Sequence, residues 1–222
     1  MIRSIWIERV ILLLFGVILF FFVLSLAISI TINSDWLYYI FIKLEHLIFI
    51  KLEHLDKKVF LTSNELWHEY KTILYYLNFP WIETLHTKLP LSVSAIHHFE
   101  DVKKLFEFNY IVLLITSIMI GIMWRRIFTK TEWWNLLNLF KVSNIIILML
   151  VCIVCLDFSN AFIVFHQLLF NNRDWIFNPA NTPIIKALPE LFFETCFIEI
   201  VVIFELVMYT FNWFLKNRLR RE

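Results

Sequence analysis

The feature that most constrains the fold is an uncharged apolar run from Val10 to Ile32. Its 23 residues would form a helix long enough to cross the ~30 Å hydrocarbon core of a bilayer, at about 1.5 Å per residue. The run exceeds the roughly 7 to 15 apolar residues of a secretory signal peptide, so we expect it to remain as a transmembrane helix. Arg3 and Arg9 precede it, and we expect the N-terminus on the cytoplasmic side.

The composition also indicates a membrane protein. Hydrophobic residues make up 60% of the 222 residues, which include 24 Phe and 9 Trp but only 2 Gly, and this is outside the range of soluble globular domains. Both glycines are isolated in apolar runs and no G-x-S-x-G motif occurs, which argues against a nucleotide-binding loop and a hydrolase elbow. The three cysteines lie in apolar segments, where a thiol behaves as a small hydrophobe.

Three more apolar segments follow, at 105–124, 142–165 and 191–215. The connection after the first of them and the C-terminal tail are rich in Lys and Arg, which marks both as cytoplasmic. The sequence therefore predicts one integral membrane domain, residues 1–222, with an all-α core of four transmembrane helices and both termini inside. The predicted segments are the helices 10–32, 105–124, 142–165 and 191–215, the extracytoplasmic cap 33–104, the cytoplasmic loop 125–141, the extracytoplasmic loop 166–190 and the cytoplasmic tail 216–222.

The segment 33–104 is too long for a bare loop and is rich in aromatic residues, so we expect a small cap lying against the bilayer. A short helix is predicted from the capping sequence TSNE at 62–65 up to Pro80. The heptapeptide FIKLEHL occurs twice, at 41–47 and 49–55. Its alternation of apolar and charged residues favours small strands, although its apolar content also permits a helix.

Two histidines far apart in sequence are predicted to meet at the outer membrane face. His98 precedes the outer end of the second predicted helix, and His166 follows the outer end of the third. Imidazole moves protons near neutral pH, so the pair is suited to acid/base catalysis. Asp101 would share a helix face with His98 and fix its tautomer. Two other interpretations remain, namely capping of the helix ends, and a metal or haem site with Asp101 as a further ligand.

Ionisable residues inside the predicted helices are further candidates, because a charge at mid-bilayer costs about 2.5 to 3.5 kcal/mol and needs a partner, a cavity or water. Glu194 lies about one turn inside the fourth helix and is expected to line the site. Asp157 precedes His166 by a helix rise of about 13 Å, which argues against a direct role. The remaining histidines assigned to the cap surface are His46, His54, His68 and His86.

Several of these residues fall into two motifs. The first, Ser-x-x-x-His-x-x-Asp-Val-Lys, comprises Ser94, His98, Asp101, Val102 and Lys103. The second comprises Phe165-His166, Phe170, Asn172, Trp175, Pro179 and Pro189-Glu190 ahead of Phe192-Phe193. Together with the order of the helices and the large outer cap, these motifs resemble the lipoprotein intramolecular transacylase (Lit) family of Gram-positive bacteria. The spacing to Asp101 selects His98, and not His97, as the histidine of the first motif.

The resemblance implies a reaction and a substrate. In a diacylglyceryl-modified lipoprotein, the acyl chain on the glyceryl sn-2 oxygen moves to the α-amine of the N-terminal cysteine, which gives the lyso form. His98 and His166 would divide the two proton transfers of this reaction. The candidates for oxyanion donors are Lys103, Asn171 and Asn172, and Trp175 is a candidate for the aromatic wall of the pocket.

The resemblance also implies a setting. We expect a multi-pass protein of the bacterial cell membrane, a monomer in contact with membrane lipid, with its active site on the extracytoplasmic side and without cofactor, metal or nucleic acid. The alternative is a non-catalytic membrane module that binds lipid, a partner or a metal at the same site. A lipase-type hydrolase of the same ester is disfavoured by the missing elbow, and an intramolecular transfer does not require an acyl-enzyme on Ser92 or Ser94.

Overall fold

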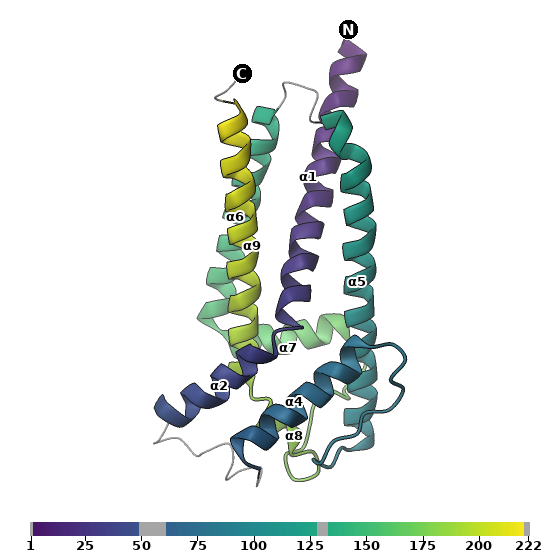
Figure 1. Ribbon diagram of the computed structural model, residues 1–222, viewed down its shortest axis with the longest axis vertical. Coiled ribbons are helices and arrows are strands. Elements are labelled where there is room, and N and C mark those ends of the chain that lie inside the picture. The colour runs from purple at the N-terminus through teal and green to yellow at the C-terminus, as the bar shows by residue number, and fades with distance from the viewer. Residues whose placement is uncertain (1, 49–60, 128–132, 220–222) are drawn as a thin grey trace. The chain divides into compact units, whose positions relative to one another are not determined.

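The computed structural model describes residues 2–48, 61–127 and 133–219, and each regular element in these ranges is a helix (Figure 1). The helices are α1 Ile2–Thr31, α2 Asp35–Ile48, α4 Ser63–Asn78, α5 Val93–Ile127, α6 Trp133–Leu156, α7 Phe158–Leu169, α8 Ile184–Ala187 and α9 Glu190–Leu219. Of these, α1 and α5 are long and apolar enough to cross a membrane, and α6 with α7 counts as a third span if the pair is taken together. The predicted all-α membrane fold agrees with this content.

The helices form two compact units. The bundle unit comprises Met1–Ser29, Asn109–Leu156 and Glu199–Glu222. The site unit comprises Ile30–Phe108 and Asp157–Ile198. Helices α5 and α9 each contribute residues to both units.

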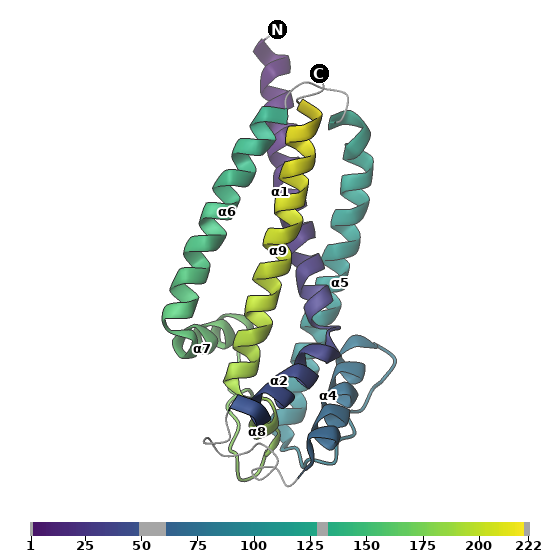
Figure 2. The same cartoon turned by 60° about the vertical axis from the view of Figure 1, so that its left-hand side comes forward.

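In the bundle unit, α1 and α6 run in one direction and the parts of α5 and α9 run in the opposite direction (Figures 1 and 2). The buried hydrophobic residues of α1 recur every fourth position, which places them on one helix face. They pack in a cluster with α6 and α9, whose members are Phe15, Leu19, Val23, Ala27, Phe140, Phe204, Met208 and Leu215. The outward side of α1 is also apolar, with Leu13, Val17 and Phe21 exposed, as expected of a helix surrounded by lipid.

A polar contact joins α1 to α5 inside the bundle unit. Asn109 Nδ2 donates hydrogen bonds to Ser29 Oγ at 2.8 Å and to the Ser25 carbonyl oxygen at 3.3 Å. All three residues are buried. Such contacts between helices are typical of membrane proteins, because an unpaired polar group in hydrocarbon is costly.

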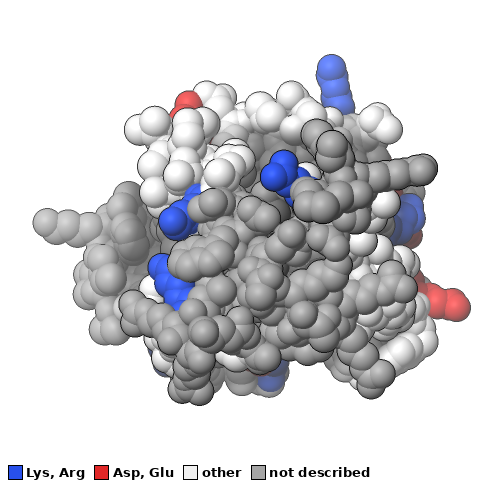
Figure 3. Space-filling view, turned by 90° about the horizontal axis from the view of Figure 1, so that it is seen from above, with Lys and Arg blue, Asp and Glu red and all other residues white. Residues whose placement is uncertain are grey.

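Basic side chains mark one end of the bundle unit, where α1 begins and α9 ends. Figure 3 looks onto this end and shows Lys and Arg side chains at several places, with the visible Asp and Glu side chains near the edge of the view. Arg9, Lys141 and Lys216 are exposed near the start of α1, the start of α6 and the end of α9. The described part of this end of the bundle unit therefore carries exposed basic side chains.

Aromatic side chains of α2, α4 and α9 build the core of the site unit. Tyr38 stacks on Tyr70 with ring centroids 4.2 Å apart, and Phe192 meets Tyr38 edge-on at 5.0 Å. The Tyr38 hydroxyl donates to the Ala187 carbonyl oxygen at 2.6 Å, which satisfies its polar atom inside the core. This cluster joins the two sequence segments that make up the site unit.

The structure corrects the expectation of strands in the cap. The first FIKLEHL copy, 41–47, lies in α2. Tyr38, Phe41 and Ile42 are buried, which is the i, i+3, i+4 spacing of a helix face, whereas a strand would bury alternate residues. The second copy, 49–55, lies outside the described residues.

Helix α4 begins at the predicted capping sequence. Thr62 Oγ1 accepts a hydrogen bond from Glu65 N at 3.3 Å, and Glu65 Oε2 accepts one from Thr62 N at 3.0 Å. This is a capping box, which satisfies two backbone donors at the helix start. The helix ends at Asn78, ahead of Pro80, as expected of a residue that cannot continue a helix.

The apolar segment predicted as the third span, 142–165, contains a break. Helix α6 ends at Leu156 and α7 begins at Phe158. Asp157 caps α7, because its carboxylate accepts hydrogen bonds from the Asn160 backbone N–H at 3.1 Å and from the Asn160 side-chain amide at 2.5 Å. His166 therefore lies on a separate helix in the site unit, and a depth estimated from one unbroken helix does not apply.

Candidate active site

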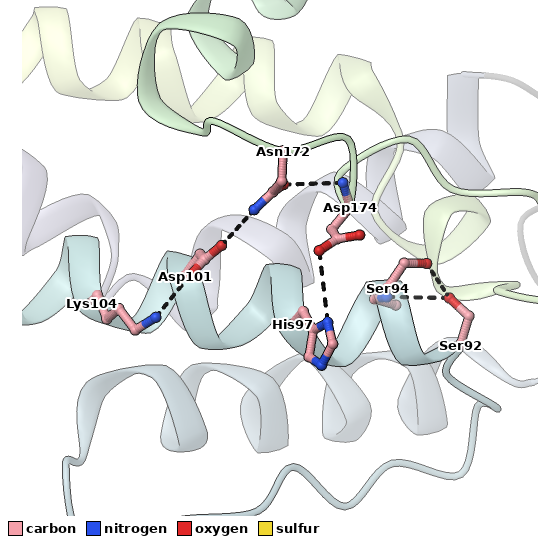
Figure 4. Close-up of polar contacts among 8 residues, drawn as sticks. Ser92, Ser94, His97, Asp101, Lys104, Asn172 and Asp174 are labelled. Carbon is pink, nitrogen blue, oxygen red and sulfur yellow. Dashed lines mark hydrogen bonds and ion pairs between the residues drawn. The ribbon is translucent and has the colours of Figure 1, made fainter.

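The first candidate histidine, His98, lies near the start of α5. Ser92 fixes this helix start, since its Oγ accepts hydrogen bonds from Ala95 N at 3.2 Å and from Thr182 Oγ1 at 2.8 Å. Ser92 and Ser94 also share a hydrogen bond between their hydroxyl oxygens at 2.9 Å (Figure 4). In the described part of the chain neither serine is hydrogen-bonded to His98, so no nucleophile–base pair of the serine-hydrolase kind is formed.

The structure brings His98 of α5 and His166 of α7 together. Their ring centroids lie 5.8 Å apart. His98 is 8% exposed and His166 is 9% exposed. The two imidazoles are therefore neighbours in a buried part of the site unit.

Aromatic rings enclose this histidine pair. Phe170 contacts both members, with centroid distances of 4.9 Å to His98 and 5.7 Å to His166. His166 is further flanked by Phe162 at 4.2 Å and by Trp175 at 5.0 Å. In such an apolar environment, hydrogen bonds and charge interactions with a bound polar group are stronger than in water.

The hydrogen bond of His166 defines its tautomer. Its Nδ1 lies 2.7 Å from the Phe162 carbonyl oxygen, and a carbonyl oxygen only accepts hydrogen bonds, so Nδ1 carries a proton. In the neutral ring, Nε2 then holds the lone pair. Nε2 is thus the atom of His166 that can accept a proton from a substrate.

His98 is held differently from His166. Its Nδ1 atom is buried, and within the described ranges no side chain or backbone group is hydrogen-bonded to it. Buried polar atoms are nearly always paired in folded proteins, and exceptions often have a catalytic role. This buried nitrogen therefore has hydrogen-bonding capacity that no described residue uses.

Asp101, predicted to support His98, is hydrogen-bonded to two other residues. Its carboxylate accepts hydrogen bonds from Lys104 Nζ at 2.8 Å and from Asn172 Nδ2 at 3.0 Å (Figure 4). Asp101 follows His98 by three residues on the same helix, and the two side chains interact electrostatically without a hydrogen bond in the described part of the chain. The carboxylate therefore contacts the loop after α7 through Asn172, and in the described ranges it does not accept a hydrogen bond from His98 Nδ1.

The amide of Asn172, a predicted oxyanion donor, is engaged in two contacts. Its Nδ2 donates to Asp101, and its Oδ1 accepts a hydrogen bond from Asp174 N at 3.1 Å. Asn171, the second candidate, is exposed. Trp175 lies against His166, where the sequence predicts a residue of the pocket wall.

Lys103, the third predicted oxyanion donor, is buried and turned towards the residues that follow α4. Its Nζ donates to the Ile82 carbonyl oxygen at 2.5 Å and lies 3.5 Å from that of Pro80. The ammonium also lies 4.5 Å from the centre of the Tyr76 ring, a cation–π contact. These contacts give Lys103 a structural role in holding that segment.

A metal centre with His98, His166 and Asp101 as ligands is one of the alternatives that the sequence leaves open. No group of three or more His, Cys, Asp and Glu side chains in residues 2–48, 61–127 and 133–219 is arranged to hold a metal ion. A ligand set of His98, His166 and Asp101 is not formed, because Asp101 is hydrogen-bonded to Lys104 and Asn172.

Glu194 is the residue of the fourth predicted helix that the sequence places near the site. Its side chain is half-buried in α9.

Residues 13–193 match the family model described as lipoprotein intramolecular transacylase Lit. The chain belongs to this family. The resemblance seen in the two sequence motifs is thereby confirmed, and the protein is an acyltransferase of the Lit type.

Solved structures of the membrane-integral Lit from Bacillus cereus are similar to this chain. One matches with a TM-score of 0.81 at 25% sequence identity and covers 97% of this chain and 99% of that chain. A variant in which a histidine is replaced by alanine matches with a TM-score of 0.81 at 25% identity, over 99% of this chain and 98% of that chain. The corresponding arginine variant matches with a TM-score of 0.80 at 25% identity, over 99% and 96%. No protein with a curated description matches.

Two parts of this Lit-family site are not predicted by the sequence analysis. The Phe162 carbonyl oxygen orients His166, and the helical spacing of four residues between them is a signal that could have identified it. Thr182 anchors the start of α5 through Ser92. Nothing in the sequence pairs these two residues, because they lie 90 positions apart.

Proposed function

We propose that this Lit-family enzyme moves the sn-2 acyl chain of the diacylglyceryl group of a bacterial lipoprotein to the α-amine of its N-terminal cysteine, which yields the lyso form. The observation that carries the proposal is the buried pair of His98 and His166, with ring centroids 5.8 Å apart. One imidazole is oriented with Nε2 as a proton acceptor, and the other has a buried Nδ1 without a hydrogen-bond partner in the described residues. His98 and His166 are the proposed catalytic residues.

The transfer requires two proton movements. The cysteine amine loses a proton as its nitrogen attacks the ester carbonyl carbon, and the sn-2 oxygen gains a proton as its bond to that carbon breaks. A C–N bond replaces a C–O bond, and water is not consumed. We assign uptake of the amine proton to His166 Nε2 and proton delivery to the departing oxygen to the neighbouring His98. The proton lost by the amine replaces the one that His98 gives up, so both imidazoles end the reaction as they began. Acid/base catalysis of this kind typically contributes about 10²- to 10⁴-fold in rate.

The aromatic surroundings of the histidine pair suit this reaction. Phe170 and Trp175 provide apolar walls for acyl chains beside both imidazoles. These walls also keep water from the ester, since water would compete with the amine as nucleophile. Donor and acceptor belong to one substrate, so holding them at attack distance can supply ~7 to 11 kcal/mol of the barrier.

We further propose that four apolar segments, in α1, α5, α6 and α9, cross the bacterial cell membrane with both chain ends in the cytoplasm. The basic side chains where α1 begins and α9 ends support this orientation. His98 and His166 would then act on the extracytoplasmic side, where a monomeric enzyme meets the lipoprotein and the surrounding lipid.

The test is mass spectrometry of the N-terminal lipopeptide of a reporter lipoprotein, expressed with this enzyme in a bacterial host that lacks amino-terminal acylation. We expect an unchanged peptide mass, with fragments that show one acyl group moved from the glyceryl group to the cysteine amine. His98→Ala and His166→Ala should each abolish this shift. His68→Ala is the matched control, because His68 is exposed on α4, and it should retain the shift.

Other results of the same experiment contradict the proposal. A lipopeptide that loses the mass of one acyl chain would show hydrolysis of the ester. Normal amounts of the lyso form with either histidine variant would refute the assigned catalytic roles.

A further inference from the structure

The loop after α7, residues 170–177 and named the site loop, carries three of the rings around the histidine pair. Phe170 and Trp175 lie against His166, and Phe177 lies 5.5 Å from His98 between ring centroids. The site loop is not helical. Its rings therefore keep their places only if contacts with a regular element hold the loop.

Two side-chain contacts join the site loop to α5 (Figure 4). Asn172 Nδ2 donates to Asp101 Oδ2 at 3.0 Å, and His97 Nδ1 lies 3.7 Å from Asp174 Oδ2. The loop is also braced internally, because Asp174 N donates to Asn172 Oδ1 at 3.1 Å. The side chain of Asn172 thus connects α5 to the backbone of the site loop.

A further contact carries the position of Asn172 to His166. Trp175 Nε1 donates to the Asn172 carbonyl oxygen at 3.2 Å. The Trp175 ring lies against the imidazole of His166 with centroids 5.0 Å apart. Asp101 lies on the same helix as His98, three residues later. A continuous series of contacts therefore links the helix that carries one histidine to the ring of the other.

We propose that the hydrogen bond between Asp101 and Asn172 is a latch that holds the site loop against α5 and thereby positions His166, through Trp175, for acyl transfer. Asp101 and Asn172 are positioning residues, because in the described part of the chain neither is hydrogen-bonded to either histidine. The effect of the latch on catalysis rests on the function proposed above. The latch itself is a property of the protein without substrate.

The latch has a defined direction, since the amide donates and the carboxylate accepts. Asn172→Asp removes the donor and sets two carboxylates against each other, which repel. Exchanging the two residues, Asp101→Asn with Asn172→Asp, restores one donor and one acceptor in the reverse order. If the hydrogen bond acts as a latch, the double variant should recover the function that Asn172→Asp loses. If the two substitutions act independently, their effects should add.

The position of the site loop can be measured independently of catalysis by the reaction of histidine with diethylpyrocarbonate, followed by mass spectrometry of peptides from the full chain in detergent. Trp175 and burial protect His166, and the exposed His68 is an internal reference. Asn172→Asp should raise the rate at His166 relative to His68 about tenfold, and the exchange variant should return it to within about threefold of wild type.

Acyl transfer should follow the same pattern. Asn172→Asp should lower kcat about 100-fold with little change in KM, because a misplacement of about 1 Å has such an effect. The exchange variant should recover kcat to within about threefold of wild type. Asn181→Asp is the matched control, since it adds the same charge at an exposed position between α7 and α8, and it should change neither rate.

Several outcomes separate the latch from the proposed function. An unchanged rate at His166 in Asn172→Asp, or an exchange variant that recovers neither rate, would overturn the latch and leave the proposed function intact. Increased modification of His166 in Asn172→Asp without acyl transfer by the wild-type enzyme would support the latch and refute the function. If Asn172→Asp does not fold, Asp101→Asn replaces it, and it should raise the rate at His166 about threefold.

Discussion

At the scale of single residues, the contacts of His166 allow its structural and chemical roles to be separated. In His166→Asn, the side-chain amide can donate to the Phe162 carbonyl oxygen as Nδ1 does, but it has no counterpart of Nε2. We expect the thermal unfolding midpoint in detergent to stay near that of wild type and the rate of acyl transfer to fall about 10²- to 10⁴-fold. Transfer at the wild-type rate would show that His166 is not the base.

For Lys103, the contacts predict an effect on stability, whereas those of His166 predict an effect on catalysis. Lys103→Met removes the donor to the carbonyl oxygens of Pro80 and Ile82, so we expect the free energy of unfolding to fall by about 1 to 3 kcal/mol. Thermal unfolding in detergent measures this loss, and Lys103→Arg, which keeps a donor, is the control. If Lys103 were an oxyanion donor, transfer would instead fall about 10²- to 10³-fold with unchanged stability.

His98 and His166 are recognisable as candidates in the sequence because each lies at the end of an apolar segment. The order of those segments predicts that both lie at one membrane face. The partner of Asp101 was not predictable in this way. Helical spacing relates residues of one helix only, whereas Asn172 is 71 positions from Asp101. Contacts between a helix and a distant loop depend on how the loop folds, and the sequence carries no signal for that.

At the scale of elements, α4 offers a test of its capping box. Thr62→Ala removes the hydroxyl that accepts a hydrogen bond from Glu65 N. Loss of such a cap typically lowers the free energy of unfolding by about 1 kcal/mol. The measurement is the thermal midpoint in detergent, and Thr62→Ser, which keeps the hydroxyl, should remain close to wild type. Equal midpoints for all three proteins would contradict the assigned cap.

The same capping box predicts a pH dependence. The pKa of the Glu65 carboxyl is lowered, first because the Thr62 backbone N–H donates to it. A carboxyl with a lowered pKa in the folded state adds stability above its ordinary pKa, and this is lost as the pH falls through the lowered value. The midpoint difference between wild type and Glu65→Gln should therefore be largest near neutral pH and disappear in acid. Glu83→Gln, at an exposed position, should show no such change.

The helices of the chain differ in how well the sequence predicts their presence and their ends. The capping sequence before α4 specifies its start, because the hydrogen bonds of a cap are local. For 41–47, the alternation of apolar and charged residues suggests a strand, and burial of Phe41 and Ile42 on one face of α2 overrides it. The break at Asp157 is hidden in a mostly apolar run, where composition predicts a span and a single capping side chain ends it.

At the scale of the whole molecule, composition and the two motifs are sufficient to predict an all-α membrane protein and its family. The orientation in the membrane stays a prediction, and it can be tested by labelling single cysteines in a background without Cys152, Cys155 and Cys196. A maleimide that does not cross membranes should label His86→Cys in intact cells and Lys216→Cys only after permeabilisation. Labelling of Lys216→Cys in intact cells would contradict the orientation.

The position of His166 in the last turn of α7 has an electrostatic consequence for the proposed reaction. Backbone carbonyl groups at the end of a helix carry a partial negative charge, which stabilises a cation there by about 0.3 to 1 kcal/mol. An imidazolium formed when His166 accepts a proton is therefore stabilised by the backbone of its own helix. The enzyme can hold this transient charge without an ionised carboxylate hydrogen-bonded to the imidazole, and an ionised group is costly to keep close to a bilayer.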